Sequence, residues 1–296
     1  MIQLIAGAVM ISFSAVFVKW TTVGPDTAAF YRMALGGGML LVFALVRRER
    51  LWPGRRAALM IALAALFFAL DLLFWHRSVR RIGPGIATLI PNFEVFALAA
   101  AGLLFFGERW RWQLGVALPV AIFGLFLLVG ADWAQMSTGY HVGIWLGLLT
   151  SVCYASYILA LRASRVRRAA GYSDIAGIAV VSLGAAALLA GAVLGGGESF
   201  VIPSWRDGGV LLAYGFCAQV AGWVLISKSL LHLKASQVGL ILLLQPVLAF
   251  VWDVLFFHGR FNSVQIAGAV IALAAIWLGQ QQAADASTAQ EAGDRL

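Results

Sequence analysis

The sequence predicts an all-α polytopic membrane protein, with ten transmembrane helices arranged as two inverted five-helix repeats. Of its 296 residues, 62% are hydrophobic and 11% are charged, whereas a soluble domain has about 45 to 50% apolar and about 25% charged residues. The apolar runs are roughly 18 to 22 residues long, enough to cross about 30 Å of hydrocarbon at about 1.5 Å per residue. Residue matches between the two halves of the chain suggest the repeat.

Apolar runs bounded by charged or turn residues define the individual spans. The connections between them are short. The ten predicted spans are Leu4–Trp20, Thr27–Val46, Ala57–Trp75, Gly85–Phe106, Trp112–Val129, Val142–Leu161, Ser173–Gly195, Gly208–Leu231, Ala235–Phe257 and Ser263–Gly279.

The distribution of positive charge predicts the orientation of these spans. If the N-terminus is cytoplasmic, fourteen basic residues lie on the cytoplasmic side: Arg47, Arg48, Arg50, Arg55, Arg56, Arg109, Arg111, Arg162, Arg165, Arg167, Arg168, Lys228, Lys234 and Arg295. Five lie outside: Arg77, Arg80, Arg81, Arg206 and Arg260. Positive charge favours the cytoplasmic side, so both termini are predicted to be cytoplasmic. The net charge of +8 then reflects membrane orientation, and no nucleic-acid partner is expected.

Three residue pairs suggest the internal repeat. Asp71 and Trp75 of the third span match Gln219 and Trp223 of the eighth at an offset of 148 residues. Glu94 of the fourth span matches Gln245 of the ninth at an offset of 151. Five spans separate the partners, and five is odd, so the second copy must be inverted relative to the first. We therefore predict repeats at residues 1–136 and 137–280, followed by a disordered cytoplasmic tail at 281–296.

Polar side chains inside the spans are the candidate functional residues, because a central charge costs about 2.5 to 3.5 kcal/mol on insertion scales. The polar candidates near the middle of their spans are Ser12, Ser14, Asn92, Glu94, Tyr154, Gln219 and Gln245. This is the depth at which alternating-access transporters bind substrate. Arg32, Asp71 and Asp253 fall in the outer third and suggest an ion pair or small network, for which structural neutralisation is the simpler interpretation.

These residue types suggest different roles. Glu94 could exchange a proton or pair with a substrate ammonium, or could be a protonated carboxyl bonded to a neighbouring helix. Asn92, Gln219 and Gln245 suit a zwitterion, or equally serve as hydrogen-bonding links between helices. Five aromatic side chains could line a pathway for apolar substrates, although packing is the commoner role. They are Trp75, Tyr154, Tyr157, Trp223 and Trp252.

Metal and cofactor chemistry is not indicated. The two cysteines, Cys153 and Cys217, lie in separate apolar runs and have no metal-ligand spacing. The Gly36–Gly38 and Gly195–Gly197 triplets lack the strand and the GK[ST] ending of a phosphate-binding loop. We expect no metal and no cofactor, so any transport by this protein should depend on a substrate or ion gradient.

Several short motifs resemble the EamA-type members of the drug/metabolite transporter superfamily. They are Lys19 in the first span, Phe30-Tyr31-Arg32, LLFFGER at Leu103–Arg109, Gln245-Pro246-Val247, and the segment Gln265–Gly279. The chain departs from that pattern where His258-Gly259-Arg260 replaces a second Gly-Glu-Arg, and where a proline occurs at Pro91 in place of Val95. Glu108 therefore has no symmetric partner.

This resemblance implies ten helices, two inverted repeats and a central cavity formed by spans one to four and six to nine. It also implies export of small metabolites, often amino acids, and the aromatic amino-acid exporter branch is the nearest. We therefore expect a multi-pass, monomeric protein of the bacterial inner membrane whose partners are a small-molecule substrate and the lipid bilayer. The alternatives are efflux of lipophilic cations, which would use Glu94, and an intramembrane aspartyl protease using Asp71 and Asp253.

Overall fold

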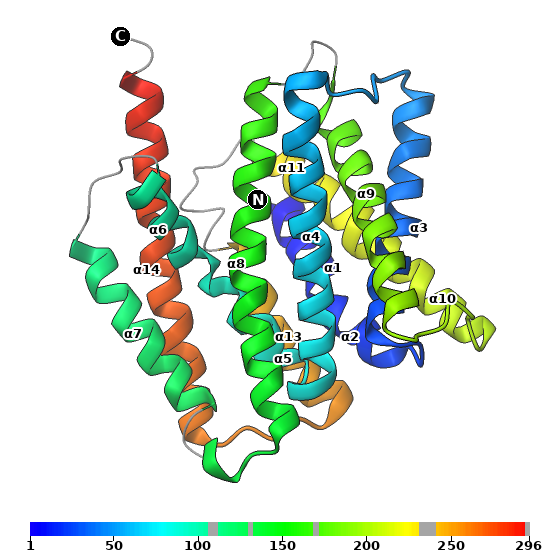
Figure 1. Ribbon diagram of the computed structural model, residues 1–296. Helices are drawn as coiled ribbons and strands as arrows, with labels where there is room; N and C mark the ends of the chain where they lie inside the picture. The colour runs from blue at the N-terminus through cyan, green and yellow to red at the C-terminus, as the bar shows by residue number, and fades with distance from the viewer. Residues whose placement is uncertain (106–111, 130–132, 168–171, 231–240, 294–296) are drawn as a thin grey trace.

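The computed structural model describes residues 1–105, 112–129, 133–167, 172–230 and 241–293, and it is all-helical over these residues. The helices, with the labels of Figure 1, are α1 (Ile2–Ser12), α2 (Ser14–Trp20), α3 (Pro25–Val46), α4 (Arg55–Ile82), α5 (Pro84–Leu89), η1 (Ile90–Phe93), α6 (Glu94–Phe105), α7 (Trp112–Val129), η2 (Trp133–Gln135), α8 (Thr138–Arg167), α9 (Asp174–Gly195), α10 (Trp205–Tyr214), η3 (Gly215–Gly222), α11 (Trp223–Leu230), α13 (Leu244–Phe257) and α14 (Ser263–Gly293).

Eight helical segments in the described part are long and apolar enough to cross a membrane. They correspond in order to the first eight predicted spans. Two shorter apolar helices, Leu244–Phe257 and Ser263–Gly279, occupy the positions of the ninth and tenth. The start of the ninth predicted span falls at residues 235–240, outside the described residues.

Several spans are interrupted where the sequence predicts one continuous helix. The first divides at Phe13 into α1 and α2. The fourth passes through the 3₁₀ turn η1, which contains Pro91; proline has no N–H to donate, so a regular α-helical bond is lost there. The eighth contains a π-helical segment, η3, which includes Gln219. Such segments are frequent at functional sites.

Helix α4 is longer than predicted and contains most of the expected Arg77–Gly85 loop. It continues past Trp75 and ends at Ile82. Gly83 follows with a φ of 85°, a conformation that favours glycine, and Pro84 then begins α5. The prediction of a loop beginning at Arg77 was wrong, because nothing before Gly83 breaks the helix. Arg77, Arg80 and Arg81 therefore extend from ordered helical turns.

The chain after Gly279 also differs from the prediction. Helix α14 continues to Gly293 and so includes most of residues 281–296, for which the sequence predicts disorder. This segment is rich in Ala and Gln, both of which have favourable helix propensity.

The helices pack in pairs that join distant parts of the sequence. Helix α3 lies against α9 at one side of the bundle, and α7 lies against α14 at the other (Figure 1). Helix α4 packs on α8 between them. The approach of α3 to η3 is close at Gly36, where an added Cβ would lie 2.5 Å from the Cβ of Gln219, so only glycine fits there.

The connections alternate between the two ends of the bundle. The segment joining α3 to α4 lies at one end, as does the last turn of α14 (Figure 1). The segments joining η2 to α8 and α13 to α14 lie at the opposite end. The charge count predicts the first end to be cytoplasmic. We call it the predicted inner end, and the opposite end the predicted outer end.

Candidate functional site

Six polar side chains from five spans meet inside the bundle, and we call them the central cluster. They are Arg32 of α3, Asp71 and His76 of α4, Glu94 of α6, Tyr154 of α8 and Tyr214 of α10. Arg32 and Asp71 are each 7% exposed, and His76 and Tyr214 are fully buried. The structure thus brings together four residues that the sequence singled out and adds two, His76 and Tyr214, that it did not.

A chain of hydrogen bonds fixes Arg32 in the cluster. Nδ1 of His76 lies 2.7 Å from the carbonyl oxygen of Leu72, which can only accept, so Nδ1 carries the proton of the neutral ring. Nε2 then accepts from the hydroxyl of Tyr214 at 3.0 Å. The Tyr214 oxygen accepts from Nη1 of Arg32 at 3.1 Å. The guanidinium also lies 5.3 Å from the centre of the Tyr214 ring, within cation–π range.

Asp71, Glu94 and Tyr154 complete the central cluster. Asp71 interacts electrostatically with Arg32 and Glu94, and Glu94 with Tyr154. Arg32 and Asp71 are not within the 4 Å of an ion pair. Arg77 and Asp26 do form one, at 2.5 Å. The two carboxylates and the guanidinium are thus neighbours without direct contact.

Gln219 lies outside the cluster and links two helices. Its side-chain amide donates to Oγ of Ser182 on α9 at 2.8 Å, and its Oε1 is buried without a hydrogen-bond partner among the described residues. Of its two predicted roles, the structure provides evidence for the link between helices. Trp223 follows at the start of α11 and is half-buried.

Other predicted polar candidates have local partners. Oγ of Ser12 accepts a bond from Nε1 of Trp252 at 2.9 Å, which joins α1 to α13. Asn92 donates to carbonyl oxygens of its own helical turn. Oγ of Ser14 is buried and has no partner in the described structure, and Gln245 is half-buried in the first turn of α13.

Two predicted lining aromatics are packed in the hydrophobic core. Trp75 is 8% exposed and meets the edge of the His76 ring at 5.0 Å between centroids. Tyr157 is 2% exposed and stacks on Phe68 at 4.5 Å. Tyr154 is only half-buried. Of the three, Tyr154 has the exposure that a lining residue requires.

Asp253 does not join Arg32 and Asp71, contrary to the predicted network. Its Oδ2 accepts the N–H of Gly85 at 2.9 Å, and its electrostatic partner is Lys19. The reason is tertiary: α13 packs against α5, which places the carboxylate at the N-terminus of α5, where negative charge is favoured.

The predicted outer end holds a second set of buried polar contacts. Asp207 accepts bonds from the Thr22 N–H at 2.7 Å and from the Thr22 and Thr21 hydroxyls at 3.0 and 3.1 Å. Glu198 accepts from the N–H and the hydroxyl of Thr27, both at 2.9 Å. We call these contacts, with the Arg77–Asp26 ion pair, the outer-end network.

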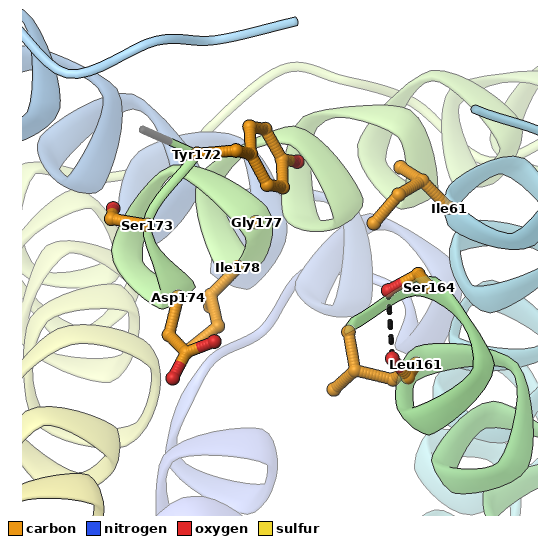
Figure 2. Close-up of a pocket in the computed structure, with 8 residues that line it drawn as sticks. All are labelled: Ile61, Leu161, Ser164, Tyr172, Ser173, Asp174, Gly177 and Ile178. Atoms are coloured by element: carbon orange, nitrogen blue, oxygen red, sulfur yellow. Dashed lines mark hydrogen bonds between the residues drawn. The ribbon is translucent and has the colours of Figure 1, made fainter. Parts of the chain in front are cut away.

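Two cavities lie away from the central cluster. Figure 2 shows one at the start of α9, where Tyr172 and Asp174 face Ser164 and Leu161 of α8. Its volume of about 10 Å³ is barely enough for one water molecule. The other, about 340 Å³, lies between α13 and α14 and is lined by Leu243, Leu244, Val247, Leu273, Ala274 and Trp277. Neither offers the charged groups of the central cluster.

The apolar helices and their alternating connections define a multi-pass membrane protein. Comparison with known proteins then identifies its family. The model of the EamA-like transporter family matches residues 1–130 and 141–279, so the chain belongs to this family. The LLFFGER motif that contributed to the resemblance ends at Arg109, and its residues 106–109 lie outside the described residues.

Two relatives and one solved structure agree with this assignment. An uncharacterized transporter of Archaeoglobus fulgidus is 24% identical over 92% of this chain and 93% of its own. A WAT1-related chloroplastic protein of Arabidopsis thaliana is 25% identical over 86% of this chain. The chain covers only 62% of that relative's length. A crystal structure with 17% identity and a TM-score of 0.65 covers 95% of this chain and 96% of its own, which supports the fold. The protein is therefore a membrane transporter of small solutes.

The two cluster residues that sequence analysis missed had different signals. His76 follows Trp75, where the third span was predicted to end, but no helix-breaking residue precedes Gly83. A longer span would have included it. Tyr214 lies within a predicted span, yet its hydroxyl could not be distinguished in sequence from an ordinary packing or interfacial tyrosine.

Proposed function

We propose that this protein is a secondary exporter of amino acids, with a preference for aromatic or other large apolar side chains. The observation that carries the proposal is the central cluster. It offers both signs of charge in a buried setting, as a zwitterion requires, with the half-buried Tyr154 beside it. Membership of a transporter family supports the general class.

The proposed mechanism is alternating access between two inverted repeats, residues 1–136 and 137–280. The contacts between helices support it. When each span is replaced by its counterpart in the other half, five spans away, an observed contact becomes another observed contact. Contact of α4 with α8 matches contact of α11 with α1, and contact of α3 with η3 matches contact of α9 with α4. The pairs α3–α9, α5–α13 and α7–α14 exchange with themselves. The two matched segments of the family model also agree with the proposed halves.

We further propose that the protein lies in a bacterial inner membrane as a monomer, with both termini cytoplasmic. The charge count supports the orientation of the termini. Reporter fusions at Leu296 and within residues 138–141 should report opposite sides of the membrane. The same side for both would contradict the topology and the inverted repeat together.

Two alternatives receive less support. Efflux of lipophilic cations would use Asp71 and Glu94 but gives no role to the buried Arg32. An aspartyl protease would need Asp71 and Asp253 to share a proton, yet these residues have separate partners.

Counterflow in proteoliposomes tests the proposed function. Vesicles preloaded with unlabelled tryptophan should accumulate labelled tryptophan without ATP, and labelled alanine should exchange more slowly. Accumulation of a lipophilic cation alone would favour the first alternative, and no exchange of any amino acid would refute the proposal.

A further inference from the structure

The guanidinium of Arg32 is a buried charge with unused hydrogen-bonding capacity. The side chain is 7% exposed, and its Nε–H is buried with no hydrogen-bond partner among the described residues. Nη1 donates to Tyr214, which is neutral. A buried charge without a direct counter-ion costs several kcal/mol. An anion bound at Nε would lower this cost.

The hydrogen-bond chain holds Arg32 ready for such an anion. The Leu72 carbonyl sets the proton on His76, His76 orients the Tyr214 hydroxyl, and Tyr214 accepts from Nη1. Three buried groups are thus used to orient one side of the guanidinium. The Nε–H has no hydrogen-bond partner among the described residues, and a planar carboxylate matches the fork geometry of arginine.

Two carboxylates lie within electrostatic range of each other, Asp71 on α4 and Glu94 on α6. Asp71 interacts with Arg32 and Glu94. Asp71 is buried and Glu94 is half-buried. No hydrogen bond from a described residue reaches either side chain. Two electrostatically coupled carboxylates without an ammonium or guanidinium in direct contact are suited to bind a cation.

We infer that the central cluster is an α-amino-acid site in which Arg32 binds the substrate carboxylate while Asp71 and Glu94 bind its ammonium group. This assignment rests on the proposed function and names the residues that would carry it. Tyr154, which interacts with Glu94, then lies next to the substrate's side chain. A structural ion pair of Arg32 with Asp71 would instead have no use for the free Nε.

Three ligands separate the two charges of the substrate. Tryptophan carries both groups, tryptamine lacks the carboxylate, and indole-3-propionate lacks the ammonium. Binding is measured on the purified full chain as the ligand-dependent rise in its unfolding temperature, so it does not require transport.

Arg32→Gln should weaken tryptophan and indole-3-propionate by about tenfold or more, the usual value of a charge-assisted hydrogen bond, and leave tryptamine almost unchanged. Asp71→Asn should give the mirror result, with weaker tryptophan and tryptamine and little change for indole-3-propionate. Arg32→Lys keeps the charge but not the fork and should be intermediate. Arg81→Gln, an exposed residue of α4 that lies outside the cluster, is the matched control.

Equal weakening of all three ligands by a folded Arg32→Gln protein, or no change in any of them, would overturn the inference. If Arg32→Gln does not fold, Arg32→Lys decides. Equal changes in the affinities of the Arg32→Lys protein for tryptophan and for tryptamine would mean that Arg32 is structural. If carboxylate binding depends on Arg32 but no amino acid exchanges in proteoliposomes, the proposed export function is refuted and the proposed site is retained. Exchange of tryptophan that Arg32→Lys and Arg32→Gln leave intact would retain the exporter and refute the site.

Discussion

The outer-end network and the central cluster both contain buried charged residues, but they differ in how these are satisfied. Asp207 is 4% exposed and accepts from Thr21, Thr22 and Ser204. Arg32 is 7% exposed, yet its Nε has no partner among the described residues. A fully bonded buried charge stabilises one arrangement of the chain, whereas an incompletely bonded one is available to a ligand.

The outer-end contacts also join the two proposed halves. Asp207 and Glu198 belong to the second half, and their partners Thr22 and Thr27 belong to the first. In the central cluster, the charged residues Arg32, Asp71 and Glu94 all belong to the first half. Changes at the outer end should therefore alter the stability of this arrangement, and changes in the centre should alter function.

The largest effect is expected at Trp75, which lies on α4 between the two regions. Trp75→Ala should lower the free energy of unfolding by about 3 to 5 kcal/mol, because a packed indole would leave a cavity. Of the two interpretations of Trp75 from the sequence, pathway lining and packing, its place in the hydrophobic core favours packing. Trp223→Ala, at a half-buried position, is the comparison.

Reversible unfolding in mixed detergent micelles would measure both tryptophan variants. A Trp75→Ala protein as stable as the parent, with selectively reduced transport of aromatic amino acids, would return Trp75 to the pathway wall and contradict the packing assignment.

An intermediate effect is expected from Asp207→Asn at the outer end. The amide keeps the shape of the side chain, but it lacks the charge that strengthens three hydrogen bonds to the first half. It also places an N–H group against hydrogen-bond donors. The expected loss is about 1.5 to 3 kcal/mol in unfolding free energy. Thr22→Val removes a single hydroxyl bond and should cost less.

Ligand binding separates a structural effect of Asp207→Asn from a functional one. The folded Asp207→Asn protein should bind tryptophan with an affinity close to that of the parent protein. A large loss of affinity without loss of stability would mean that the outer end and the substrate site are not distinct regions.

The smallest effect on stability is expected from Glu94→Gln in the centre. No hydrogen bond from a described residue reaches the Glu94 side chain, so its amide should change the unfolding free energy by no more than about 0.5 kcal/mol. Its effect should be functional: the pH dependence of transport should flatten, because Glu94 is the acidic residue placed near the middle of a span. Uptake measured in vesicles across a pH series would test this, with Glu49→Gln at the predicted inner end as the control. An unchanged pH response would assign Glu94 a structural role.

Much of the fold was predictable because membrane spans are specified locally. An apolar run must bond its own backbone in lipid, so its length and composition indicate a helix before any contact is known. Helix ends were less predictable. Trp75 ended an apolar run, but α4 continues to Ile82, and in this extension Ser78 bonds to the Gly143 carbonyl on α8 and Arg77 pairs with Asp26.

Part of the candidate site was also predictable, since Arg32, Asp71, Glu94 and Tyr154 stand out as polar residues in apolar runs. The sequence alone did not show that they meet, that His76 and Tyr214 join them, or that Asp253 accepts the Gly85 N–H instead. Burial cost acts on each residue separately and can be read from its place in a span. Partner choice depends on how five helices from both halves of the chain pack, and only the tertiary structure decides which charges are satisfied and which remain open to a ligand.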